Sequence, residues 1–138
     1  MKSGLFEIFT NTMIVGVGID IVEHARIARI HGRYGDKFAR RILDELEMED
    51  YRKAPSQVSL LAKRFAAKEA ASKALGTGFT RGITFKMICV RHDDNGRPLL
   101  ELRARAAEHA NKLGAVTPWL SISDEENYSI AMVVLESS

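Results

Sequence analysis

SLLAKRFAAKEAASKALGTG, residues 59–78, is the segment around which the chain is organised, because it combines strong helix formers with a two-glycine exit. Its alanines recur every three or four residues, which gives a predicted helix one smooth face for close packing against another backbone. The larger side chains occupy two adjacent rows: Arg64, Lys68 and Ser72 in one, and Phe65, Glu69 and Lys73 in the other. Gly76 is expected to end the helix in a left-handed conformation.

Glu69 is the one acid among the cations of this predicted helix. A Glu and a Lys four residues apart are most often an exposed ion pair worth about 0.2–0.5 kcal/mol. A carboxylate beside several cations, an aromatic ring and a glycine loop also suits a site for an anion and a metal ion. The helix alone leaves both interpretations open.

Residues 13–22, MIVGVGIDIV, alternate in the manner of a β-strand. β-branched side chains occupy one face, and Gly16, Gly18 and Asp20 occupy the other. Glycine inside a strand often marks close approach by another backbone, so we expect this face to pack against the alanines of the central helix. Asp20 then lies at the rim, either as an end-of-strand hydrogen-bonding residue or as a partner of Glu69.

The composition predicts one soluble domain without membrane insertion. The 138 residues are 46% hydrophobic and 28% charged, and no apolar run approaches the ~20 residues that span a bilayer. The single cysteine, Cys89, lies in an apolar run and is expected to be a buried, reduced thiol, which favours the cytoplasm. Residues 1–12 are interpreted as an extension, too interrupted for a signal peptide, and residues 13–138 as a single domain.

Residues that typically begin or end helices and turns predict the remaining elements. Gly35 separates two short helices, Pro55 ends a third, Ser56 can cap the central helix, and Gly114 ends the last helix. Asn95-Gly96 signals a β-hairpin. The elements expected outside the central segment are helices on both sides of Gly35 and over residues 44–54 and 104–113, and strands over residues 83–91, 99–103, 119–123 and 128–136.

A cluster of cations follows the first strand. Net charge is only +2, but six cations lie within residues 26–41 and point away from the apolar side of the two short helices. These six residues are Arg26, Arg29, Arg33, Lys37, Arg40 and Arg41. The cluster is either a solvated face or a dock for an acidic protein or a nucleic acid.

Absent motifs narrow the chemistry. The chain has no phosphate loop of the G-x-x-x-x-G-K-[ST] type, no G-x-G-x-x-G opening a helix, no paired CxxC and no G-x-S-x-G elbow, which disfavours hydrolases and dinucleotide enzymes. Its four histidines lack zinc-like spacing. Asp20 and Glu69 remain, and hard oxygen ligands with cations nearby suit Mg²⁺ that is held partly by a substrate phosphate.

Four motifs carry a resemblance to a known family. GVGIDIVExxRI near the start, RFAAKEAxSKALGTG in the middle, NGRP in the hairpin and SISD near the end are similar to the holo-[acyl-carrier-protein] synthases, the small bacterial 4′-phosphopantetheinyl transferases. The resemblance covers residues 13–135, and the segment before Met13 has no counterpart in it. It implies an α+β fold, with a small antiparallel sheet packed against a long central helix. It also implies a homotrimer with active sites at the subunit interfaces.

The resemblance also implies an activity and a site. The reaction is transfer of 4′-phosphopantetheine from coenzyme A to a serine of apo acyl carrier protein in fatty acid biosynthesis, with release of adenosine 3′,5′-bisphosphate. Asp20, Glu69 and Lys73 match the catalytic positions, the first two as Mg²⁺ ligands and the lysine as a contact to the phosphates. The positions implied for coenzyme A are Arg64, Phe65, Ser72, Lys73, Gly76, Thr77, Pro98 and Asp124, the last of which is histidine in some members. The positions implied for the carrier protein are Arg26, Ile30, Arg33, Lys37 and Arg41.

Two other classes compete with this interpretation. A basic nucleic-acid-binding module would use the cation cluster, but it leaves Asp20 and Glu69 unexplained, and an aromatic content of 7% is unlike that of a single-strand binder. We therefore expect no nucleic-acid partner. A Mg²⁺-dependent pyrophosphate hydrolase would share the carboxylates and differ only in the acceptor.

Overall fold

The computed structural model describes residues 12–138, so the predicted N-terminal extension lies outside the described residues apart from Thr12. The elements follow one another as β1 (Ile14–Glu23), α2 (His24–Tyr34), α3 (Asp36–Ile42), α4 (Glu45–Lys53), α5 (Gln57–Leu75), the 3₁₀ turn η1 (Phe85–Met87), β2 (Ile88–His92), β3 (Pro98–Leu102), α6 (Ala104–Leu113), β4 (Thr117–Asp124) and β5 (Tyr128–Glu136). The predicted α+β class is confirmed.

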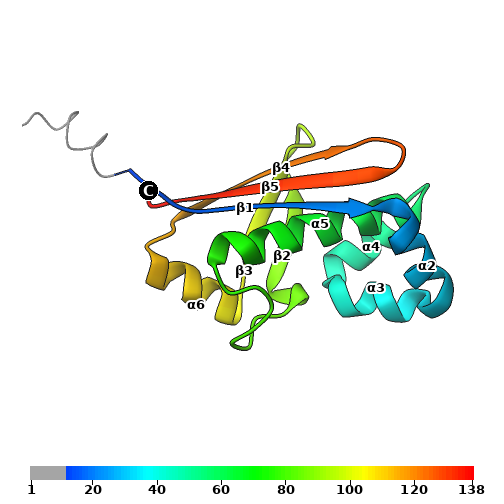
Figure 1. Cartoon of the computed structure of the whole chain (residues 1–138), viewed down its shortest axis with the longest axis horizontal. Coiled ribbons are helices and arrows are strands. Elements are labelled where there is room, and N and C mark those ends of the chain that lie inside the picture. The colour runs from blue at the N-terminus through cyan, green and yellow to red at the C-terminus, as the bar shows by residue number, and fades with distance from the viewer. Residues whose placement is uncertain (1–11) are drawn as a thin grey trace, which may run out of the picture.

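The strands form two antiparallel sheets in the described part of the chain, rather than the single small sheet expected from the resemblance. One sheet has three strands in the order β1, β5, β4, and the other is the β2–β3 hairpin. α5 packs along β1 and β5. Figure 1 shows that α2, α3 and α4 gather at one end of α5 and that α6 lies near the other.

β1 and α5 approach each other closely at the two glycines of the strand. A Cβ atom on Gly16 would lie within 3.0 Å of the carbonyl oxygen of Ala74, and one on Gly18 within 3.0 Å of the carbonyl oxygen of Ala70. The predicted packing of the glycine face on the alanine face is therefore confirmed. Because side chains alternate along a strand, Val17, Ile19 and Ile21 of β1 point away from α5 and are exposed.

The helix ends agree with their capping signals. The Ser56 hydroxyl accepts a hydrogen bond from the Ser59 backbone N–H (3.2 Å), so α5 begins at Gln57. Gly76 and Gly114 follow α5 and α6 with φ angles of 79° and 77°, the left-handed conformation that glycine adopts without strain. These three predictions are confirmed.

The predicted strand over residues 83–91 is wrong in its first half. Pairing with β3 begins only at Ile88, and η1 occupies the preceding residues. The Lys68 ammonium donates to the carbonyl oxygen of Phe85 (3.1 Å), and the Phe85 ring stacks on Phe79 with 3.9 Å between centroids. These two contacts hold Phe85 away from β3, so this part of the chain does not pair with the hairpin.

The core lies between α5, the three-stranded sheet and the helices at its ends. Six alanines of α5 are buried in it, together with large side chains such as Ile27, Ile42 and Leu135. Cys89 is a buried free thiol, as predicted, and burial raises its pKa to about 11. No helix within residues 12–138 is long and apolar enough to cross a membrane.

Candidate active site

Three predicted site residues meet where α5 packs on β1. Lys73, in the last turn of α5, donates from Nζ to a carboxylate oxygen of Asp20 (2.9 Å) and to the carbonyl oxygen of Ile19 (3.0 Å). Glu69 lies one turn earlier on the same helix and is partly buried. Asp20 is two residues beyond Gly18 on the same strand face, so the close glycine packing sets its position against α5.

The cations near Glu69 do not fully offset its burial and the neighbouring negative charge, so its pKa is raised. Burial raises the pKa of Glu69 and the negative charge of Asp20 raises it further, whereas Lys73 and Arg26 lower it. The site is open to solvent, because half of the Lys73 side chain is exposed. Two carboxylates that repel each other at an open site are hard oxygen donors of the kind that Mg²⁺ prefers, so these residues fit that ion.

The cations of the row Arg64, Lys68 and Ser72 pair with a buried acid and not with Glu69. Lys68 is fully buried and donates to Glu47 of α4 (2.8 Å), and Arg64 also pairs with Glu47 (3.3 Å). The buried Ser72 hydroxyl donates back to the carbonyl oxygen of Glu69 (2.7 Å). Two positive side chains of α5 therefore pair with a buried acid on another helix.

A row of aromatic rings extends from Arg26, the first residue of the cation cluster. The Arg26 guanidinium lies 5.5 Å from the ring centroid of Phe65, whose ring lies 5.5 Å from Phe85. Phe79 stacks on the other side of Phe85. Phe79 and Phe85 were missed in the sequence, where the only signal was their position just after the glycine loop that ends α5. Arg26, which contacts the first of these rings, is close enough to Glu69 to lower its pKa electrostatically.

The residues implied for carrier binding lie on α2 and α3. Their cations are exposed, and Ile30 is partly buried between them and the core. The two helices follow each other around Gly35, so the five positions belong to one region of the surface. The set, called the dock below, consists of Arg26, Ile30, Arg33, Lys37 and Arg41.

Residues 16–133 match the 4′-phosphopantetheinyl transferase superfamily. The chain belongs to this superfamily. A holo-[acyl-carrier-protein] synthase of Alkalilimnicola ehrlichii is 53% identical to it over 127 residues, 91% of this chain and 99% of the relative. One from Vibrio cholerae is 52% identical over 124 residues, 90% of this chain and 98% of the relative.

Solved structures agree with this membership of the transferase superfamily. The holo-[acyl-carrier-protein] synthase of Neisseria meningitidis is similar with a TM-score of 0.83 and 41% identity, over 89% of this chain and 98% of that chain. A synthase of Bacillus anthracis, in complex with CoA (3′,5′-ADP), is similar with a TM-score of 0.77 and 41% identity, over 91% of this chain and 99% of that chain.

The other positions implied for coenzyme A are spread over the transferase fold. Gly76 and Thr77 follow α5 directly, whereas Pro98 begins β3 and Asp124 ends β4. In the described residues no hydrogen bond or ion pair joins Pro98 or Asp124 to Glu69. The positions on and just after α5 therefore come from one element, whereas Pro98 and Asp124 come from two others.

A second acidic cluster lies in the core of this transferase. Asp44, Glu47 and Cys89 hold potential metal-ligating atoms within 4.8 Å of one another. Arg91 donates to both carboxylate oxygens of Asp44, and Lys68 donates to Glu47. Although burial alone would raise the pKa of Asp44, its hydrogen bonds with Arg91 hold it well below the usual range. These carboxylates already have cationic partners, so the cluster is an ion-paired part of the core.

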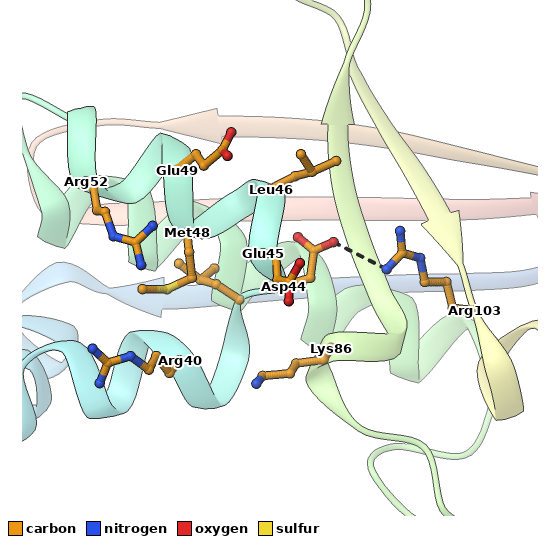
Figure 2. A pocket seen from close by; sticks show the side chains of 10 residues that line it. Arg40, Asp44, Glu45, Leu46, Met48, Glu49, Arg52, Lys86 and Arg103 are labelled. Carbon is orange, nitrogen blue, oxygen red and sulfur yellow. Dashed lines mark ion pairs between the residues drawn. The ribbon is translucent and has the colours of Figure 1, made fainter.

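A groove of about 850 Å³ opens beside this cluster (Figure 2). It lies between α3 and α4 on one side and η1 and the start of α6 on the other, with Arg40 and Lys86 among its lining residues. Arg103 lies 3.6 Å from Asp44 across part of it. Acidic and basic side chains are mixed along the groove, and none of the residues that meet at the α5–β1 contact lines it.

Proposed function

We propose that this protein transfers 4′-phosphopantetheine from coenzyme A to a serine hydroxyl of apo acyl carrier protein. The products are holo acyl carrier protein and adenosine 3′,5′-bisphosphate. The observation that carries the proposal is the meeting of Asp20, Glu69 and Lys73 at the α5–β1 contact of a superfamily member. The names of its relatives, and the CoA (3′,5′-ADP) complex of one of them, support it.

Asp20 and Glu69 would hold Mg²⁺ at this site. When bound, the ion supplies positive charge to the pyrophosphate of coenzyme A and so stabilises the charge that develops on the leaving phosphate. The two ligands come from different elements, and their separation is set by the glycine face of β1 against α5. The repulsion that raises the pKa of Glu69 is the cost that a divalent cation would offset.

Lys73 has two tasks in the proposed reaction. Its hydrogen bonds to Asp20 and to the Ile19 carbonyl hold the carboxylate on the α5 side of the strand. Its half-exposed ammonium can also turn toward a bound phosphate, where positive charge stabilises the transition state of phosphoryl transfer. Gly76 and Thr77 follow the end of α5 that carries Lys73, and Phe65 lies one turn before Glu69 on the same helix. These three residues would line the coenzyme A site with Arg64, Ser72, Pro98 and Asp124.

The dock would bind the acidic helix of the carrier protein. Its cations are exposed on α2 and α3, and Arg26 stacks on Phe65 next to Glu69. A carrier helix bound along these residues would bring its serine toward the carboxylates. Complementary charge of this kind mainly accelerates association and selects the partner.

We also propose that the protein is a homotrimer with active sites at the subunit interfaces. The face of β1 that points away from α5 exposes Val17, Ile19 and Ile21 by 57%, 58% and 60%, and Ile130 and Met132 of β5 continue this apolar face. An exposed patch of this type is typical of a protein interface. A neighbouring subunit would supply the parts of the coenzyme A site that one chain leaves apart. Light scattering combined with size-exclusion chromatography tests the trimer, and a monomer would contradict it.

Incubation of the protein with coenzyme A and Mg²⁺, with and without apo carrier protein, tests the activity. Mass spectrometry should show phosphopantetheine on the carrier serine and an equal amount of adenosine 3′,5′-bisphosphate. Release of the nucleotide without carrier would indicate a pyrophosphate hydrolase instead. Failure of both reactions, with binding to nucleic acid, would favour the basic binding module.

A further inference from the structure

Tyr51 of α4 joins the two helices that carry the dock. Its side chain is fully buried, and its hydroxyl donates to Asp36 (2.8 Å), the first residue of α3. The same hydroxyl lies 2.8 Å from Nε2 of His31, in the last turn of α2. The edge of one ring meets the face of the other, with 5.9 Å between centroids and 84° between planes.

The hydrogen bonding of this link is determined by the one proton of the phenol. Because that proton is donated to Asp36, the hydroxyl can only accept from His31, whose Nε2 must therefore carry a hydrogen. Burial and the nearby Asp36 raise the pKa of Tyr51 to about 12. The phenol therefore keeps its proton at the pH of an ordinary transferase assay.

The link adds a side-chain connection between two helices that are otherwise joined through backbone hydrogen bonds at Gly35 and anchored separately in the core. α3 has only seven residues, and a helix of that length is not stable by itself. Ala39 and Ile42 anchor it in the core, but its first turn begins directly after Gly35, a flexible residue with φ 55°. The Tyr51 hydroxyl ties this first turn to the end of α2.

We propose that Tyr51 is a positioning residue for carrier binding, because it sets the spacing between the dock cations of α2 and those of α3. The inference rests on the proposed function. Tyr51 touches neither substrate, since it is buried beneath the two helices. Its effect would reach the carrier through Arg33 at the end of α2 and Lys37 at the start of α3, which flank the link in the chain.

Tyr51→Phe tests this role, because it removes the hydroxyl and keeps the ring in the core. The expected result is a roughly 3- to 10-fold higher KM for apo carrier protein, the size of effect that the loss of about one net hydrogen bond produces. The kcat and the KM for coenzyme A should stay within about twofold, because the α5–β1 contact is unchanged. Calorimetry should show the same loss of carrier affinity.

Two comparisons separate positioning from general stability. Tyr34→Phe is the matched control, since Tyr34 also lies at the end of α2 but is 51% exposed and makes no hydrogen bond through its hydroxyl among the described residues. Asp36→Asn and Asp36→Ala form a second pair. Both remove the charge, but only asparagine keeps an oxygen that can accept the Tyr51 proton, so only asparagine should preserve the KM for the carrier.

The outcomes are distinguishable from those of the proposed function. If the wild-type protein transfers no phosphopantetheine to any apo carrier, the proposed function fails, whatever the variants do. If the wild type is active and Tyr51→Phe only lowers the melting temperature, Tyr51 stabilises the fold and the positioning role is refuted. Equal losses in kcat and in both KM values, or equal effects of the two Asp36 variants, would also refute it.

Discussion

Replacing Gly18 with alanine should damage both stability and activity. The new Cβ would lie within 3.0 Å of the carbonyl oxygen of Ala70 and 2.7 Å from the backbone nitrogen of Ala74, and backbone atoms in a helix cannot turn aside as a flexible side chain can. Overpacking of this kind costs typically about 1–3 kcal/mol. The lower entropy of the unfolded chain offsets only about 0.4–1 kcal/mol. We therefore expect a net loss of about 1–2 kcal/mol.

The same substitution should reduce transfer, because it forces β1 away from α5. Asp20 follows Gly18 on the same strand face, so its distance from Glu69 and Lys73 would increase. Activity should therefore fall at temperatures where the variant is still folded. Measuring activity at these temperatures distinguishes a displaced active site from loss of the folded protein.

Urea unfolding at equal chain concentration measures the change, since the proposed assembly would make stability depend on concentration. Gly32→Ala is the control: it is the same exchange within α2, where nothing lies within 4 Å of the added Cβ. It should raise stability by up to about 1 kcal/mol. A Gly18→Ala protein within about 0.5 kcal/mol of wild type would refute the close contact that we infer.

Three further variants test the site and the dock. Glu69→Gln keeps the shape but loses the charge that would hold Mg²⁺, so transfer should nearly vanish while circular dichroism is unchanged; wild-type activity at ordinary Mg²⁺ would contradict the metal assignment. Lys73→Ala should lower kcat more than coenzyme A affinity, and an effect on binding alone would make the lysine only an anchor. Arg33→Glu should raise the KM for the carrier, and added salt should reduce the difference in KM between the variant and the wild type. A KM that does not depend on salt would refute carrier binding by the dock. Arg33 is a cleaner choice than Arg26, which also acts on Glu69.

Local signals in the sequence predicted most element boundaries, because each of them acts within a few residues. Ser56 and Gly76 delimit α5 through hydrogen bonds and a backbone angle that depend only on their neighbours. The contact between β1 and α5 was also predictable, since glycine on one element and alanine on the other leave room for close packing. The glycines of β1 and the alanines of α5 are small because the two backbones approach each other closely.

The environment of Arg64 and Lys68 could not be predicted, because it depends on an acid that is distant in the sequence. Glu47 belongs to DELEMED, residues 44–50, where nothing distinguishes it from its exposed neighbour Glu49. Only the packing of α4 against α5 buries Glu47 and directs both cations toward it. The failure of the strand prediction before Ile88 has the same origin, because Lys68 also binds a carbonyl group there.

β1 connects the proposed assembly face to the proposed metal site, because its residues alternate between the two. Gly18 and Asp20 face α5, whereas Ile19 between them is exposed on the opposite side and its carbonyl oxygen accepts a hydrogen bond from Lys73. Burying the exposed side of this strand in an interface would restrict its movement relative to α5. The position of Asp20 would then depend on assembly as well as on the glycine contact, so a chain that cannot assemble should lose activity even with an intact set of carboxylates.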